Sequence, residues 1–90
     1  MTESISKFIY RGMHSQVLLF TMKSGDLLKA HRAPVSVLII AGKGSMEMTI
    51  EEKTIVLQQG DHILLEANTK HSIHAIESLQ FYLIKLEPHG

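Results

Sequence analysis

From position 15 onward the sequence alternates short apolar segments with turn-forming residues such as Gly, Asp, Asn and Lys. No segment keeps apolar residues at helical spacing over the roughly ten or more positions that a helix requires. Many short strands at regular spacing are typical of a β-sandwich or a closed β-barrel. The pattern therefore predicts an all-β protein.

The clearest alternation lies in residues 45–50, SMEMTI. Met46, Met48 and Ile50 would share one face of a strand, and the polar residues between them would share the other. An antiparallel strand with one buried face has this pattern. Residues 51–54, EEKT, then form the predicted hairpin turn. We interpret Met46 and Met48 as core residues rather than copper ligands, because thioethers fill irregular gaps well.

The length of the chain bears on its assembly. Ninety residues make one small domain, and we expect residues 1–90 to form it. A monomer of this size buries only about two thirds of its unfolded surface. Residues 35–42, VSVLIIAG, and 79–86, LQFYLIKL, are apolar on both strand faces. One face would enter the core and the other would pack on a second subunit, so the sequence predicts a homodimer.

Composition excludes several classes of partner. Nine Lys and Arg balance nine Asp and Glu, without the basic stripe that nucleic acid or an anionic membrane would require. There is no Cys, which excludes disulfides, thiolate catalysis and Cys-ligated zinc. No stretch approaches the roughly twenty apolar residues of a membrane helix, and the N-terminus lacks a secretory pattern. We expect a cytoplasmic protein whose partners are small molecules or a second copy of itself.

One stretch resembles the first motif of the cupin superfamily. It comprises residues 25–44, GDLLKAHRAPVSVLIIAGKG. In this motif a glycine is followed after five residues by a histidine, and then by a strand that ends in a glycine turn. Gly25, His31, Gly42 and Gly44 occupy these positions. We expect Gly25 and Gly42 to serve turns.

A second stretch resembles the second cupin motif. It comprises residues 60–75, GDHILLEANTKHSIHA, in which Gly60 and Asp61 open a strand and His71 begins the next strand. Gly60 permits the positive φ that other residues resist, and we expect Asp61 to support the turn through its side-chain oxygen. Because two motifs occur in the family's order, the resemblance is more specific than a single pattern.

The resemblance implies a jelly-roll, or double-stranded β-helix, barrel with a pocket at its open end. Cupins often bind a metal there through two histidines and a glutamate of the first motif and the histidine of the second. In this chain Ala33 stands where the second histidine would be, and residues 34–38 contain no carboxylate. Two of the four expected ligands are therefore absent, and His31 and His71 are left.

His31 and His71 are the predicted metal ligands, for one divalent ion such as Zn, Fe, Mn or Ni. A tight site has three or four protein ligands, so two imidazoles would hold the ion weakly. His14 is a candidate third donor. Strand alternation directs His62 and His74 away from the pocket if their apolar neighbours face the core. Each pocket histidine also has a purely structural interpretation, as a hydrogen-bonded polar residue at the barrel mouth.

Three functions from different classes fit these residues. The first is a binding module in which His31, Arg32 and His71 lie at the mouth of an apolar pocket, with Arg32 available to an anionic ligand. The second is a metal-dependent enzyme such as an isomerase or dioxygenase. The usual oxygenase site needs a carboxylate beside two histidines, and the motif positions provide none. The third is a structural dimer without a ligand. The sequence assigns no catalytic residue.

Overall fold

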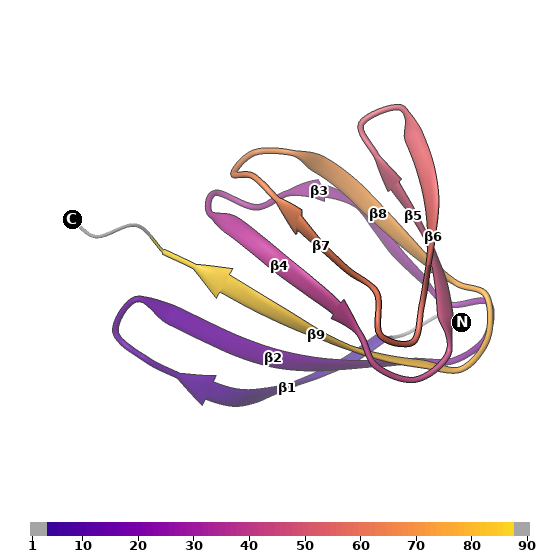
Figure 1. Cartoon of the computed structure of the whole chain (residues 1–90), viewed down its shortest axis with the longest axis horizontal. Helices are drawn as coiled ribbons and strands as arrows, with labels where there is room; N and C mark the ends of the chain where they lie inside the picture. Colours follow the sequence, from indigo (N-terminus) through magenta and orange to yellow (C-terminus); the bar gives the residue numbers. More distant parts are fainter. Residues whose placement is uncertain (1–3, 88–90) are drawn as a thin grey trace.

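The computed structural model describes residues 4–87, which form nine β-strands and no helix (Figure 1). The strands are β1 (Ser4–Arg11), β2 (Ser15–Met22), β3 (Leu27–Arg32), β4 (Ser36–Ala41), β5 (Ser45–Ile50), β6 (Lys53–Gln58), β7 (His62–Leu65), β8 (Lys70–Ala75) and β9 (Leu79–Leu86). The prediction of an all-β protein is confirmed. Across these described positions there is no helix long and apolar enough to cross a bilayer.

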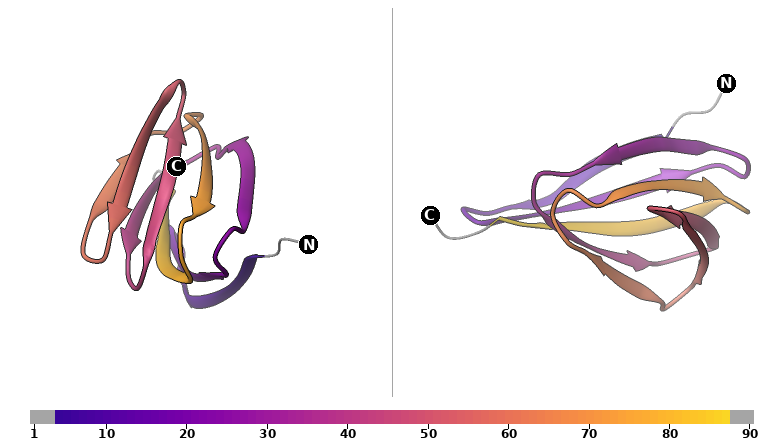
Figure 2. Two further views of the ribbon diagram at one scale, coloured as in Figure 1. Left: turned by 90° about the vertical axis from the view of Figure 1, so that its right-hand side faces the viewer. Right: turned by 90° about the horizontal axis from the view of Figure 1, so that it is seen from above.

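The strands form two antiparallel sheets that lie on opposite sides of the core (Figure 2). One sheet has five strands in the order β1-β2-β9-β4-β7, and the other has four in the order β3-β8-β5-β6. From β2 to β9 the chain alternates between the two sheets, apart from the β5–β6 hairpin. Neighbouring strands are therefore often distant in sequence, as β3 and β8 are. This is the double-stranded β-helix arrangement that the resemblance implied.

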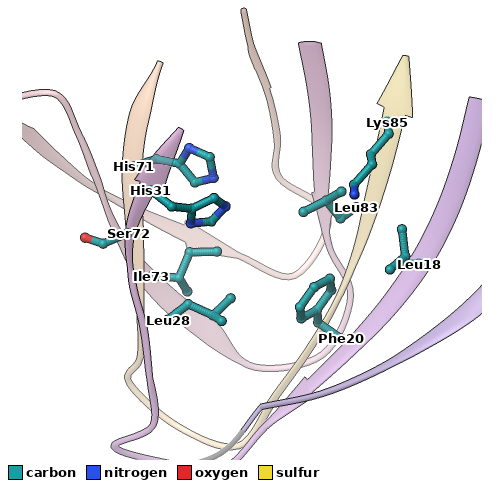
Figure 3. A pocket seen from close by; sticks show the side chains of 9 residues that line it. All are labelled: Leu18, Phe20, Leu28, His31, His71, Ser72, Ile73, Leu83 and Lys85. Carbon is teal, nitrogen blue, oxygen red and sulfur yellow. The ribbon is translucent and has the colours of Figure 1, made fainter. Parts of the chain in front are cut away.

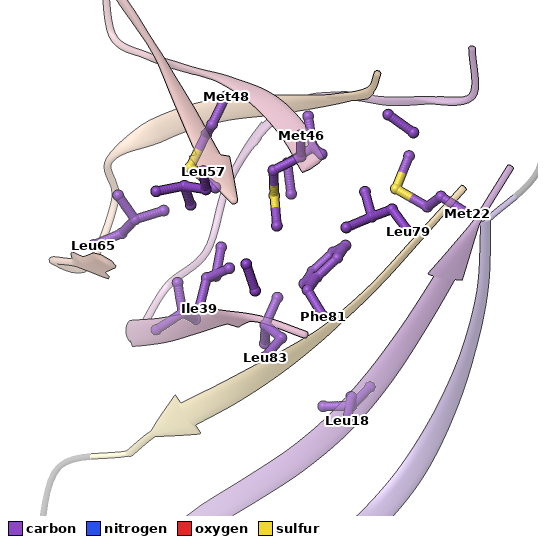
Figure 4. Packing of buried hydrophobic residues seen from close by; sticks show 14 residues of the cluster. Leu18, Met22, Ile39, Met46, Met48, Leu57, Leu65, Leu79, Phe81 and Leu83 are labelled. Carbon is purple, nitrogen blue, oxygen red and sulfur yellow. The ribbon is translucent and has the colours of Figure 1, made fainter. Parts of the chain in front are cut away.

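The core lies between the inner faces of the two sheets (Figure 4). Met46 and Met48 of β5 are fully buried, and Ile50 packs against the same cluster, so the alternation predicted for residues 45–50 is confirmed. From the other sheet, the ring of Phe81 stacks on that of Phe20, with centroids 5.0 Å apart. Each fully buried side chain of this kind contributes about 1.5–3 kcal/mol through removal from water.

Two turns with the same Gly-Asp sequence lead the chain from one sheet to the other. Gly25 and Gly60 adopt φ values of 90° and 94°, which side chains with a Cβ disfavour. In each turn the following residue, Asp26 or Asp61, accepts a hydrogen bond on its carboxylate from the backbone N–H three residues earlier, at 2.9 Å and 2.8 Å. These bonds fix the direction in which β3 and β7 begin.

Two further turns lie where the sequence suggested them. β5 and β6 are joined through Glu51 and Glu52, within the EEKT segment, as the register of the two strands requires. Gly42 directly follows β4, and its N–H donates to the carbonyl oxygen of Gln80 at 2.8 Å. This hydrogen bond holds the end of β4 beside the start of β9.

Candidate functional site

A cavity of about 270 Å³ opens between the two sheets (Figure 3). β3 and β8 form one wall, and β2 and β9 form the facing wall. Most of the lining is aliphatic or aromatic, and the polar groups are few. The lining residues are Leu18, Phe20, Leu28, His31, His71, Ser72, Ile73, Leu83 and Lys85. Ser72 points away from the cavity, whereas the two histidine rings and the Lys85 amine point toward it.

His31 and His71 meet on the wall formed by β3 and β8. They lie directly opposite each other in the register of these two strands. Their ring centroids are 4.5 Å apart and the ring planes are tilted by 57°. His71 is 2% exposed, whereas His31 is exposed at the rim. The two motifs of the sequence therefore come together in one place, through a pairing between strands that are far apart in the chain.

Both rings are oriented by the same kind of hydrogen bond. Nδ1 of His71 lies 3.0 Å from the carbonyl oxygen of Thr69, and Nδ1 of His31 lies 3.2 Å from that of Lys29. A carbonyl oxygen can only accept, so each Nδ1–H donates. In the neutral ring this leaves Nε2 with its lone pair available. Metal-binding histidines in proteins are commonly held this way.

Burial changes the protonation of His71. Removal from water lowers its pKa below the ordinary histidine value, and the neighbouring His31 ring adds to this effect. The hydrogen bond to the Thr69 carbonyl acts in the opposite direction but is the smaller influence. His71 is therefore a neutral imidazole at pH 7, the form in which Nε2 can accept a proton or a metal ion.

Lys85 on β9 brings the one ammonium group of the cavity lining. Leu79, Phe81 and Leu83 are buried on the inner face of this strand, and Lys85 continues the same alternation. Its amine approaches the cavity from the wall opposite the histidines. Lys85 was not predicted from the sequence, although a single charge at an inward position of LQFYLIKL was the signal that could have found it.

Arg32 was expected beside His31 in the pocket, but it is not among the residues that line the cavity. Successive side chains of a strand point to opposite faces, so the neighbour of an inward His31 points outward. The Arg32 guanidinium instead donates to the carbonyl oxygen of Asn68 at 2.9 Å and lies 3.7 Å from the Glu51 carboxylate.

His14, His62 and His74 lie away from the pair. His14 is exposed in the connection between β1 and β2. Within residues 4–87, no three His, Cys, Asp or Glu side chains gather closely enough to hold a metal ion, so His14 does not complete a three-donor site. His62 is exposed, and His74 directs Nδ1 to within 3.6 Å of the Glu47 carboxylate on the outer surface. The outward orientation predicted for these two residues is confirmed.

Comparisons with known proteins agree with this fold. The family model described as "Cupin domain" matches residues 18–85. A conserved protein of unknown function from Streptococcus pyogenes superposes with a TM-score of 0.88 at 22% identity, over 98% of this chain and 77% of that one. A cupin superfamily protein from Desulfitobacterium hafniense gives 0.89 at 19% identity, over 96% and 79%.

An RmlC-like cupin from Methanocaldococcus jannaschii, which has a double-stranded β-helix fold, gives a TM-score of 0.85 at 23% identity, over 94% of this chain and 81% of that one. At these identities the structural likeness concerns the fold alone. No curated protein matches the chain significantly. Because the family model covers most of the chain, including both stretches that carry the histidines, the chain belongs to the cupin domain family.

Proposed function

We propose that this cupin domain binds a small organic molecule in the cavity between its two sheets. The observation that carries the proposal is the cavity itself, about 270 Å³ with apolar walls and a few converging polar groups. Small-molecule sites typically combine an apolar concave surface with a few polar groups that orient the ligand. His31, His71 and Lys85 are the polar groups that would set the orientation.

A divalent metal ion is the second element of the proposal. The two Nε2 lone pairs of His31 and His71 fit half of a four-ligand site, and the Nδ1 hydrogen bonds orient both rings for it. Ala33 occupies the position of a further family ligand and cannot bind a metal. An ion held by two imidazoles would keep water or ligand at its other positions, and its affinity would be low.

Calorimetric titration with zinc tests the metal site directly, using protein without a histidine tag. His31→Ala and His71→Ala should each abolish binding, because either change leaves a single imidazole. The control is His74→Ala, which removes a histidine from the same strand on the outer surface and should leave binding unchanged. Loss of binding in His74→Ala but not in His31→Ala would contradict the assignment, provided circular dichroism shows intact folds.

The cavity lining also bears on the choice between a binding module and a metal-dependent oxygenase. A facial site for iron needs a carboxylate beside two histidines. None of the nine residues that line the cavity is Asp or Glu. A binding module is therefore the better supported of the two functions.

We also propose that two copies pair through one face of the five-stranded sheet. This outer apolar face consists of Tyr10, Val17, Leu19, Leu38, Ile40, Leu64, Tyr82, Ile84 and Leu86, all on the side away from the core. Five of them form one unbroken row across the five strands, because consecutive members pair in register: Tyr10, Val17, Ile84, Leu38 and Leu64.

A neighbouring row across the same face has basic residues at its two ends, Lys7 on β1 and His62 on β7, and no charged residue between them. A two-fold interface places the same surface on both subunits, and a face with an uncharged centre avoids opposing like charges. Sedimentation velocity at tens of micromolar should therefore show a dimer. A monomer at that concentration would contradict the proposal.

A further inference from the structure

We propose that the ligand of the cavity is a small organic acid, with its carboxylate on Lys85, an apolar body between the sheets and a hydrogen-bond donor at the His31–His71 wall. This inference rests on the proposed function, because it assigns a chemical class to the ligand of that same cavity. The ligand would also have a fixed orientation, because the two facing walls of the cavity differ in charge and in hydrogen bonding.

The cavity lining contains one ammonium group, that of Lys85. Lys85 is partly buried beside Leu83, and its ammonium group faces an apolar space. The cavity lining contains no carboxylate, and within residues 4–87 no carboxylate lies within ion-pair distance of Lys85. A cation beside apolar walls loses hydration that only an opposite charge or strong acceptors restore. A carboxylate on the ligand would provide that charge.

The wall formed by His31 and His71 requires a hydrogen-bond donor on the ligand, not an anionic group. His31 and His71 use their Nδ1–H groups on the backbone carbonyls of Lys29 and Thr69, so the neutral rings present acceptors and no donor. A second anionic group would find no partner there. In the metal-free protein, a hydroxyl or N–H group of the ligand could donate to Nε2 of either ring, and the centroids of the two rings lie 4.5 Å apart.

The volume and the apolar lining of the cavity determine which ligand body fits between the two walls. Leu18, Phe20, Leu28, Ile73 and Leu83 line it, and Phe20 is held in place by its stacking on Phe81. An apolar cavity of about 150 Å³ is large enough to bind benzene. The 270 Å³ available here therefore accommodates one ring and a short chain. A phenolic acid such as 3-(4-hydroxyphenyl)propionate combines the three required features.

Calorimetry on the metal-free protein at pH 8, where an ordinary histidine is neutral, tests the inference with matched ligands. We expect 3-(4-hydroxyphenyl)propionate to bind at least about tenfold more tightly than its primary amide, because the amide removes a charge-assisted contact. Lys85→Met keeps the length of the side chain. It should abolish this preference because it weakens the binding of the acid and leaves the binding of the amide unchanged. Lys53→Met, which removes an exposed lysine of β6, should leave the preference unchanged.

Toluene separates failure of this inference from failure of the proposed function, because it tests the cavity without any polar contact. If toluene binds and the acid has no advantage over its amide, the cavity is a ligand site but the organic-acid assignment is wrong. An unchanged preference for the acid in Lys85→Met also overturns the assignment. If neither toluene nor the acid binds, the proposed function fails together with the inference.

Discussion

The two sheets of this protein are alike on their inner faces and opposite on their outer faces. Both bury apolar side chains against the common core. The outer face of the four-stranded sheet carries Glu47, Thr49, Ser72 and His74 along its two central strands, whereas the outer apolar face of the five-stranded sheet carries Leu, Ile, Val and Tyr. Residues of both outer faces are accessible to solvent in a single chain. This difference is the basis for proposing that two copies pair through the outer apolar face and not through the other sheet.

The inner faces also divide the candidate site between the sheets. The four-stranded sheet provides two hydrogen-bond acceptors, His31 and His71, and the five-stranded sheet provides one cation, Lys85. Neither sheet alone forms a binding site for a polar molecule. Any ligand that uses both kinds of group must therefore lie between the sheets, which makes binding sensitive to how they pack.

The largest expected effect comes from the shared core. Phe81→Ala removes a fully buried ring that stacks on Phe20 and leaves a cavity between the sheets. We expect the free energy of unfolding to fall by about 3–5 kcal/mol in urea denaturation. Val56→Ala, at a 51% exposed position on the outer face of the four-stranded sheet, should cost about 1 kcal/mol or less. Equal costs would show that the inner faces are not the source of stability.

The next largest effect concerns dimer formation, which should depend on one outer face and not on the other. Tyr82→Glu introduces a carboxylate at the middle strand of the outer apolar face, where Tyr82 pairs with Leu19 and Ile40. In a two-fold dimer each substitution occurs twice in the interface, so we expect the dissociation constant to rise about a hundredfold or more by sedimentation. Val56→Glu makes the same change on the other sheet and should leave the dimer intact. Equal behaviour of the two variants would refute the distinction.

A smaller effect concerns pH. Burial lowers the pKa of His71, so below about pH 6.5 the unfolded chain binds more protons at this residue than the folded chain does. The stability associated with neutral His71 is present above the unfolded pKa and is lost as pH falls through the folded pKa. The metal-free wild type should therefore lose more stability than His71→Gln between pH 7 and pH 5 in urea titrations.

His74→Gln provides the comparison from the outer face of the same strand. The His74 side chain is 44% exposed, and its profile of stability against pH should resemble that of the wild type. If His71→Gln also kept the full pH dependence, burial of His71 would not be its origin.

The smallest effect is expected for the His74–Glu47 pair itself. The two side chains are about half exposed and 3.6 Å apart, and exposed pairs of this kind contribute about 0–1 kcal/mol. Glu47→Gln should therefore change the free energy of unfolding by less than about 1 kcal/mol at pH 6. A larger loss would indicate that this outer face is covered rather than hydrated, and would weaken the contrast between the two sheets.

Local patterns in the sequence were sufficient for part of this structure. The alternation of residues 45–50 predicted that Met46 and Met48 are buried, and the positions of His62 and His74 followed from the same two-residue period. The Gly-Asp pair at residues 60–61 predicted a turn supported by the aspartate, and the structure has that hydrogen bond. These features depend on residues a few positions apart, so they can be predicted without knowing the fold.

Which side chains line the cavity together depends on the tertiary structure. The family resemblance pointed to His31 and His71, but their approach to 4.5 Å depends on the pairing of β3 with β8. Arg32 was placed wrongly in the pocket and Lys85 was overlooked although the alternation of their own strands bears on both, but the position of Lys85 across the cavity from the histidines depends on the packing of the two sheets. Alternation tells which side chains share a face of one strand, because that rule is local. Which strands face each other across a cavity is decided by long-range pairing and packing of the two sheets, which no short segment of this chain specifies.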